Sequence, residues 1–569
     1  MLGFAKAPKD PLSDTRSAQR WIESFTASDP LAAHAALIVE LGRIAQPAID
    51  RRPAALEALF FVDAQAREMR ERLFAQYIAH APRSDKIEEQ LWHALFDLSQ
   101  GFLRAYAACE RDVLEHAQEP AWQALLPELL MRQILQLGVD AQIRMFRYEA
   151  WIPAKWADLH RCYTLASARK LEGQRLTLAG EPAPRTIEQK YLATLVLHLC
   201  NAGNLDRAQL DWLAHHLDDW CAPLALATES TGPTAFYLNF EERHGLRRRD
   251  ATPLEGPVMF LDTEPLHALL QHYILAVEQK VRGQPLAAKT PRRIEHLGLL
   301  TKLAMQVDPA FRPMPRRGER TAAVGAVDAI VGLQRITDFL HNETDSSVPE
   351  LDTVGTYSGT LDIAVFGHLR DEDARRKAVA RRRLAAFTTP GGPWEIKDVS
   401  ATGLRLIAPM TAAGSLTLGT LVALRAEGDV VWKLGIVRRM RRVTADAAEV
   451  GLQRIADSIT QVDLCTQRPE HDHDYDVEGN AMVHHGRSFR GLFLALQPRE
   501  GRKVIQSLIF PASEYRSGGR HRLQGVSASY PVRFAPVIET QKEWCWTGVE
   551  TGPSTEIEAP SPPLSAGIA

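Results

Sequence analysis

The sequence has little that would support a redox, metal or membrane protein. The six cysteines of its 569 residues are at positions 109, 162, 200, 221, 465 and 545. None forms a CxxC pair, and this spacing favours buried thiols in a reducing compartment over a disulfide framework. The first residues lack the apolar core of a signal peptide, and apolar runs such as LATLVLHLC are too short to span a bilayer. We therefore expect a soluble, cytoplasmic protein.

The sequence also lacks a strong excess of charge and the common catalytic motifs. The formal net charge is −3 and the isoelectric point is near 6.7, which argues against a nucleic-acid coat or a polybasic membrane binder. A phosphate-cradling glycine loop, HExxH, GxSxG and paired catalytic carboxylates do not stand out. We therefore predict that the chain is not an enzyme, needs no cofactor and binds no nucleic-acid polymer.

The N-terminal half is patterned for helices. With 45% hydrophobic residues, a chain of this length predicts three or more domains. From about residue 15 to 222, apolar residues recur at i, i+3, i+4 and i+7, which predicts an all-α domain, a bundle or a solenoid, over 15–222. An aromatic stripe lies within it, formed by Trp92, Phe96, Phe102 and Tyr106. We interpret this stripe as helix core.

The C-terminal half is patterned for strands. After short aromatic runs and one helix, which predict a mixed connecting subdomain over 223–310, alternating runs with turn signals predict a small β-barrel over 311–458. Polar and charged residues at about 342–392 predict a linker with one short helix inserted into that barrel. A second small β domain is predicted over 486–552, followed by a disordered tail over 553–569.

A basic motif precedes the first strand of the predicted barrel. Arg316, Arg317 and Arg320 stand just before a run of small and β-branched residues. Guanidinium groups bind phosphate oxygens, or the O6/N7 edge of guanine, with two parallel hydrogen bonds. Solvated surface arginines are the alternative that spacing alone leaves open. Lys377 and Arg381 have the same spacing in RRKAVARRR, but lysine lacks the planar fork, so we favour the arginine pair.

An acid, a hydroxyl and a glycine follow in the next strand-like run. Asp398, Ser400 and Gly403 lie in KDVSATGLRL. A short acid accepts from the guanine N1 and N2 protons or orients an arginine, a hydroxyl donates to phosphate or base, and glycine lets backbone approach a ligand. The alternative is a turn acid and hydroxyl that cap a β-bend.

Together these motifs resemble those of the PilZ family of bacterial cyclic di-GMP receptors. In that family RxxxR at the mouth of a six-stranded barrel and D/NxSxxG on a neighbouring strand form the ligand site. Trp432, Gly435 and Arg438 match the family's W-x-x-G-x-V-R strand. The resemblance implies that cyclic di-GMP contacts Arg316, Arg317, Arg320, Asp398, Ser400, Gly403 and Arg438. It also requires the inserted linker to leave the barrel between its first two strands.

Two hypotheses for the function follow. In the first, a PilZ-like barrel senses cyclic di-GMP without catalysis, and the helical half transmits the signal to a protein partner. In the second, the barrel binds no nucleotide and the chain is an interaction scaffold.

A histidine-rich stretch at 470–485 contains potential metal ligands. These are His471, His473, Asp474, His484 and His485. The stretch has no predicted helix or strand to fix a coordination geometry, so we interpret it as a solvated spacer and assign no metal.

Overall fold

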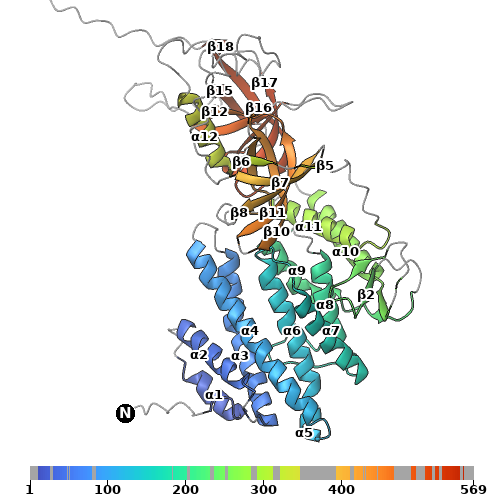
Figure 1. Ribbon diagram of the computed structural model, residues 1–569. Coiled ribbons are helices and arrows are strands. Elements are labelled where there is room, and N and C mark those ends of the chain that lie inside the picture. Colours follow the sequence, from blue (N-terminus) through green and yellow to red (C-terminus); the bar gives the residue numbers. More distant parts are fainter. Residues whose placement is uncertain are drawn as a thin grey trace, which may run out of the picture. The chain divides into compact units, whose positions relative to one another are not determined.

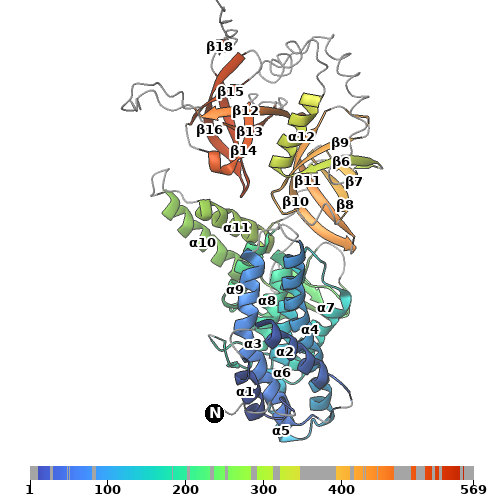
Figure 2. The same ribbon diagram turned by 90° about the vertical axis from the view of Figure 1, so that its left-hand side faces the viewer.

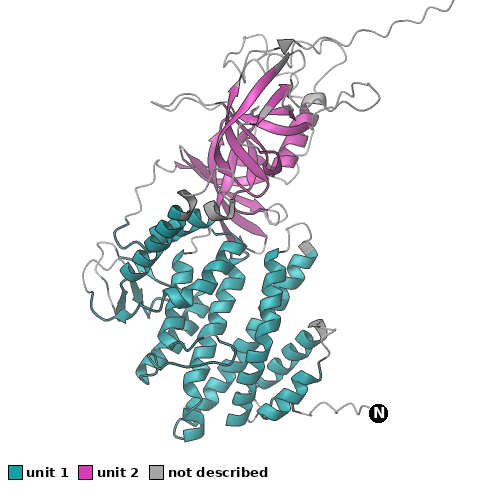
Figure 3. Cartoon of the chain, turned by 180° about the vertical axis from the view of Figure 1, so that it is seen from behind, with its two compact units in different colours: residues 1–315 teal, residues 316–569 magenta. Residues whose placement is uncertain are grey.

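The chain folds into two compact units, which are described separately. Unit 1 comprises residues 1–315 and unit 2 residues 316–569 (Figure 3). The computed structural model describes residues 10–25, 30–47, 49, 51–79, 85–181, 183–200, 205–230, 236–249, 254, 256–282, 291–311, 321–323, 325–346, 393–400, 402–409, 416–426, 428–429, 431–444, 446–466, 488–494, 506–515, 519–524, 528–551 and 555–556.

Unit 1 is built mainly of helices, as the sequence pattern predicts. The first nine are α1 (Thr15–Glu23), α2 (Pro30–Ile44), α3 (Pro53–Ala79), α4 (Asp85–Glu115), α5 (Pro120–Gln123), α6 (Leu126–Met145), α7 (Pro153–Ala168), α8 (Ile187–Cys200) and α9 (Arg207–Trp220) (Figure 1). Helix α3 begins at a proline, whose fixed φ suits the first helical turn. Helix α9 begins with a capping box, in which Asp206 and Gln209 each accept a hydrogen bond from the other's backbone amide.

The aromatic stripe of α4 is core, as predicted. Trp92, Phe102 and Tyr106 are 6%, 0% and 0% exposed, and the partly buried Phe96 packs against the same cluster. The core also holds charge, because Arg132 forms a buried ion pair of 3.1 Å with Asp63. Among the described helices, none combines the length and the apolarity that a bilayer crossing requires.

A small sheet and two more helices complete unit 1. The strands are β1 (Leu226–Ala227), β2 (Phe236–Asn239), β3 (Arg247–Arg248) and β4 (Val258–Leu261), in the order β1-β4-β2-β3, and the helices are α10 (Glu264–Arg282) and α11 (Pro291–Val307). Phe236, Leu261 and Leu303 belong to the same buried cluster as the helical core. The predicted boundary at residue 222 therefore falls inside one compact unit.

The first half of unit 2 is a closed six-stranded barrel. Its elements are β5 (Thr321–Ala322), β6 (Ala326–Val331), α12 (Leu333–Ser346), β7 (Pro393–Ser400), β8 (Gly403–Pro409), β9 (Leu421–Ala426), β10 (Lys433–Thr444) and β11 (Ala447–Ala456). The order is β7-β6-β9-β10-β11-β8, pairing of β7 with β8 closes the ring, and β5 adds to β7. The chain leaves the barrel between β6 and β7. This excursion is the one required if the basic motif and the acid, hydroxyl and glycine motif are to lie in one barrel. Of the predicted linker, residues 347–392 lie outside the described residues.

A second closed barrel follows. Its strands are β12 (Thr460–Thr466), β13 (Ser488–Leu494), β14 (Ser507–Pro511), β15 (Arg520–Gln524), β16 (Ala528–Thr540), β17 (Trp544–Thr551) and the short β18 (Thr555–Glu556). The ring runs β15-β12-β13-β14-β17-β16 and closes by pairing of β15 with β16. The prediction placed its start at residue 486, but β12 belongs to it. Because β12 follows β11 after only a few residues, the alternating pattern did not show where one barrel ends and the next begins.

Helix α12 joins the two barrels. Its apolar residues Leu333 and Ile336 are buried in a cluster that contains Trp432 of the first barrel and Trp544 of the second. The helix contacts β6 and β9 on one side and β12 and β13 on the other (Figure 2). Helix α12 is therefore a packed core element that begins before the predicted linker at about 342–392, and it joins the two barrels through one buried cluster. The short helix predicted inside that linker falls largely outside the described residues.

Candidate functional site

The three residues of the acid, hydroxyl and glycine motif form one end of a β-hairpin. Ser400 is the cross-strand partner of Gly403, and its Oγ donates a hydrogen bond of 3.2 Å to the Gly403 carbonyl oxygen. A Cβ atom at Gly403 would lie 2.5 Å from the backbone oxygen of Leu452 in β11. Glycine is therefore required for the close approach of β8 to β11, in addition to any role toward a ligand.

Asp398 is paired with Arg405, an arginine that neither motif assigns to the site. Arg405 is its cross-strand partner, and Arg405 Nη2 lies 2.6 Å from Asp398 Oδ2. Asp398 is 5% exposed, whereas the Arg405 side chain is 42% exposed. The Arg405 Nε atom is buried and has no hydrogen-bond partner among the described residues.

The register of the hairpin would have revealed Arg405. When Ser400 faces Gly403 across a two-residue turn, antiparallel pairing places Asp398 opposite Arg405. Knowledge of the turn length would therefore have identified Arg405 as the partner of Asp398, but the motif pattern alone does not determine that length.

Further charged side chains continue the face of the barrel beside Arg405. Glu449 of β11 lies 3.8 Å from Arg405 Nη1 and accepts a hydrogen bond of 3.0 Å from Arg441 Nη2 in β10. Cross-strand neighbours have their side chains on the same side of a sheet. Side chains of both charges therefore follow one face of the barrel from β7 across β8 and β11 to β10.

The described residues resume directly after the basic motif, with strand β5, which pairs with strand β7 of this hairpin. Thr321, which follows Arg320 in the sequence, is the cross-strand partner of Val399, and Ala322 is the partner of Asp398. The strand that begins at the end of the basic motif therefore pairs with the strand that carries the acid. Arg316, Arg317 and Arg320 themselves lie outside the described residues, as do Lys377 and Arg381.

Arg438, which the resemblance assigns to the ligand, forms an ion pair within the chain. Its Nη1 and Nη2 atoms donate to the carboxylate of Glu539 in β16 at 2.6 and 2.5 Å, and its Nε donates to Gln453 Oε1 at 2.7 Å. The guanidinium fork that the resemblance assigned to the ligand thus binds an acid of the second barrel. A motif match does not reveal such a partner, because Glu539 lies far away in the sequence.

The described residues offer no group of three or more His, Cys, Asp and Glu side chains that would hold a metal ion. The histidine-rich stretch at 470–485 lies outside them.

Comparison with known proteins finds two similarities, both to a cyclic-di-GMP receptor. A family model described as the N-terminal domain of the cyclic-di-GMP receptor FimW matches residues 16–230, from α1 to β1 of unit 1. The cyclic-di-GMP receptor FimW of Pseudomonas aeruginosa is 23% identical over 343 residues, which cover 53% of this chain and 54% of the relative. The chain thus spans about half the length of that curated relative. No solved structure matches the chain.

Proposed function

We propose that this chain is a non-enzymatic receptor for cyclic di-GMP, whose first barrel binds the ligand beside the β7–β8 hairpin. The observation that carries the proposal is the pairing of β5 with β7, in which Thr321 faces Val399 and Ala322 faces Asp398. This pairing brings Thr321, the residue that follows the basic motif in the sequence, to the strand of the acid. The similarity of unit 1 to a domain of a cyclic-di-GMP receptor supports the same ligand.

In this proposal the basic motif binds the phosphates and one guanine. The guanidinium groups of Arg316, Arg317 and Arg320 supply paired donors for phosphate oxygens or for guanine O6 and N7. Asp398 accepts from guanine N1 and N2, and Ser400 donates to a phosphate or a base. All of these are binding roles, so the site needs no cofactor and carries out no reaction.

Arg405 adds a donor to the proposed site. Its Nη2 is held by Asp398 at 2.6 Å, and its Nε is buried without a partner among the described residues. The Arg405 side chain as a whole is 42% exposed, so an acceptor group of the ligand would meet the guanidinium at the barrel surface. Asp398 would then orient Arg405 as well as contact the base.

We further propose that ligand binding is communicated to the second barrel through Arg438. Gln453 is the cross-strand partner of Gly403, and it accepts a hydrogen bond from Arg438, whose fork holds Glu539 of the second barrel. Ligand binding at the hairpin would shift an equilibrium of unit 2 along this path, and unit 1 would pass the change to a protein partner.

A second candidate function is that of a scaffold that binds no nucleotide. It is favoured by the ion pairs of Asp398 with Arg405 and of Arg438 with Glu539, since both motif residues already have partners inside the chain.

Isothermal titration of the full chain with cyclic di-GMP distinguishes the two candidates. We expect a dissociation constant that is micromolar or tighter, and much weaker binding of cyclic di-AMP, because adenine lacks the O6 acceptor and the N2 donor. The absence of heat at high ligand concentration would exclude the receptor function.

Two variants then locate the site. Arg320→Ala is expected to weaken binding by roughly 1.5–3 kcal/mol, the range of a hydrogen bond to a charged group. Arg335→Ala serves as the matched control, because Arg335 is an exposed arginine of α12. Unchanged affinity in Arg320→Ala would move the basic half of the site to Arg381 and its neighbours.

A further inference from the structure

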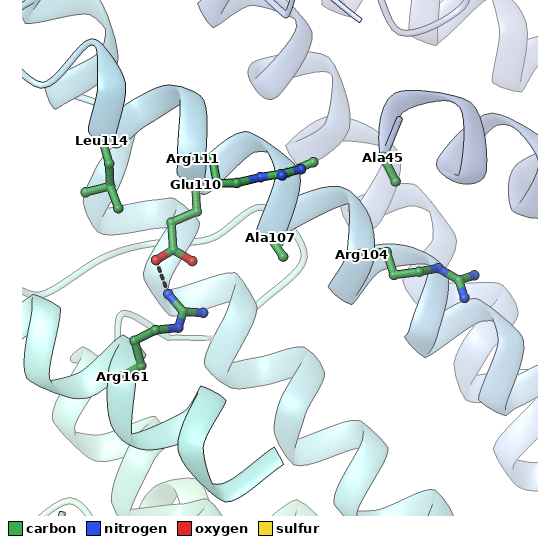
Figure 4. A pocket seen from close by; sticks show the side chains of 8 residues that line it. Ala45, Arg104, Ala107, Glu110, Arg111, Leu114 and Arg161 are labelled. Atoms are coloured by element: carbon green, nitrogen blue, oxygen red, sulfur yellow. Dashed lines mark hydrogen bonds and ion pairs between the residues drawn. The ribbon is translucent and has the colours of Figure 1, made fainter. Parts of the chain in front are cut away.

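An open groove on unit 1 is lined by α4, by α7 and by Ala45, which directly follows α2. Its volume is about 550 Å³. A smaller cavity of about 160 Å³ shares Arg104, Ala107 and Arg161 with it and extends it to Lys155. Figure 4 shows the side chains of Arg104, Arg111 and Arg161 around the methyl group of Ala107. The groove is far from the motifs in sequence and has no part in the proposed nucleotide site.

The floor of the groove is one exposed stripe of α4. Arg104, Ala107, Arg111 and Leu114 are spaced at i, i+3, i+7 and i+10, so they share one face of the helix. All four are exposed, and Leu114 is 39% exposed although it is a large apolar residue. This spacing is that of the seam through which one helix packs against another. At 1.5 Å per residue, the stripe is about 15 Å long, or roughly three helical turns.

Small side chains make this stripe accessible to a helix. Ala107 lies between the two arginines on α4, and Ala45, just after the end of α2, lines the opposite side of the groove. Helices approach each other to about 8–10 Å between their axes, and short side chains at the contact favour the closer distance. The exposed Leu114 supplies an apolar contact at one end of the stripe.

The groove is basic. Arg104, Arg111, Arg161 and Lys155 line the two joined cavities, and the acids that line them are Glu110 and Asp158. Glu110 is 3% exposed and already binds Arg161 and Gln133. Among the described residues, Arg104 and Arg111 form no ion pair. The available positive charge therefore lies on α4, on either side of Ala107, and at Lys155 of α7.

We infer that this groove docks an acidic amphipathic helix of a partner protein, with carboxylates seven residues apart opposite Arg104 and Arg111. The two arginines are two turns apart, about 10.5 Å along the axis, which is more than one phosphate or carboxylate group spans. An occupant that pairs with both and also covers Ala107 and Leu114 must be extended, with one apolar and one acidic edge. A helix with heptad spacing meets these requirements.

The test uses designed peptide probes and the full chain. The probe is a fluorescent helical peptide of about three heptads, with alanine and leucine on one face and glutamates seven residues apart beside that face. The matched peptide has glutamine in place of each glutamate. Fluorescence anisotropy measures the affinity of both peptides at low and at high salt.

We expect the glutamate peptide to bind the wild-type chain at least about tenfold more tightly than the glutamine peptide at low salt, with a smaller difference at high salt. The double variant Arg104→Glu/Arg111→Glu should lose this preference and should instead bind a peptide with lysine at the same positions. Arg72→Glu, an exposed arginine of α3, should behave like the wild type. Circular dichroism of each variant checks that the helices are intact.

Three results would overturn the inference: no binding of either peptide, equal binding of both, or a folded double variant that still prefers glutamate. Dimerisation of the full chain that the double variant abolishes would also overturn it, because the occupant would then be a second copy of the chain. None of these measurements involves cyclic di-GMP, so their outcome is independent of the proposed receptor function.

Discussion

The ion pair between Arg438 and Glu539 is predicted to hold the two barrels together. Removal of either side chain breaks two parallel hydrogen bonds of 2.6 and 2.5 Å. Exposed ion pairs contribute about 0.2–1 kcal/mol, whereas hydrogen bonds to charged groups in less exposed positions contribute about 1.5–3 kcal/mol. The two side chains are 37% and 22% exposed, between these cases. We therefore expect a coupling free energy of about 1–2 kcal/mol, after allowance for solvent screening.

A double-mutant cycle measures this coupling. The variants are Arg438→Ala, Glu539→Ala and the double substitution, all in the full chain. Arg438→Ala also removes the hydrogen bond to Gln453, but this loss occurs in the single and in the double variant and therefore cancels in the coupling free energy. Hydrogen exchange, followed by mass spectrometry of peptides from β10 and β16, gives the local opening free energy of each barrel.

A second ion pair is the matched control. Arg441 and Glu449 lie 3.0 Å apart within the first barrel, and the Arg441 side chain is 52% exposed. Their coupling should be no more than about 1 kcal/mol and should leave β16 unaffected. A coupling below about 0.3 kcal/mol for Arg438 and Glu539 would refute the reasoning. So would destabilisation confined to β10, because an inter-barrel contact must also affect β16.

Three further predictions concern stability. Gly403→Ala should destabilise the first barrel by about 1–3 kcal/mol, because its Cβ would clash with the backbone oxygen of Leu452. Gly325→Ala should not destabilise it, because the nearest atom to its Cβ, in Ile396, would be 3.8 Å away. Hydrogen exchange of β8 compares the two variants. Asp63→Asn should destabilise unit 1 by about 1.5–3 kcal/mol in urea unfolding, because it removes the buried carboxylate that pairs with Arg132, which among the described residues keeps only its ion pair with Glu128. Burial lowers the pKa of His198 to about 3. As the pH falls from about 6.5 toward 3, the unfolded chain binds a proton at His198 that the folded chain does not bind. The free energy of unfolding should therefore decrease by about 1.4 kcal/mol for each pH unit of acidification. His198→Leu should remove this one-proton contribution.

The helices and the presence of a closed barrel were predictable because their signals are local. The proline that begins α3 and the 3.6-residue periodicity of α4 lie within the elements that they specify. Domain limits were less predictable. Strand β12 has the same alternating pattern as β11, and only pairing with β13 and β15 assigns it to the second barrel. Likewise, α12 is buried by residues of both barrels, which are distant from it in sequence.

The candidate site was predictable only in part, for a similar reason. A motif identified Asp398 by its spacing from Ser400, and the pairing of β5 with β7 agrees with the expected excursion between strands. The motif contained no information on Arg405, whose position depends on the turn length. It also gave no sign of the ion pair that Arg438 forms with Glu539 of the second barrel. Long-range partners compete for the same guanidinium groups that a ligand would use, and spacing does not reveal them.

Hydrogen exchange of the full chain with and without cyclic di-GMP tests the central claim most directly. We expect the ligand to slow exchange in two segments that are distant in sequence, residues 316–323 and the hairpin around Asp398 and Arg405. Peptides from α1 and α3 should not show the same direct protection. Binding that protects neither segment, or only one of them, would contradict the claim that the basic motif and the acid belong to one site.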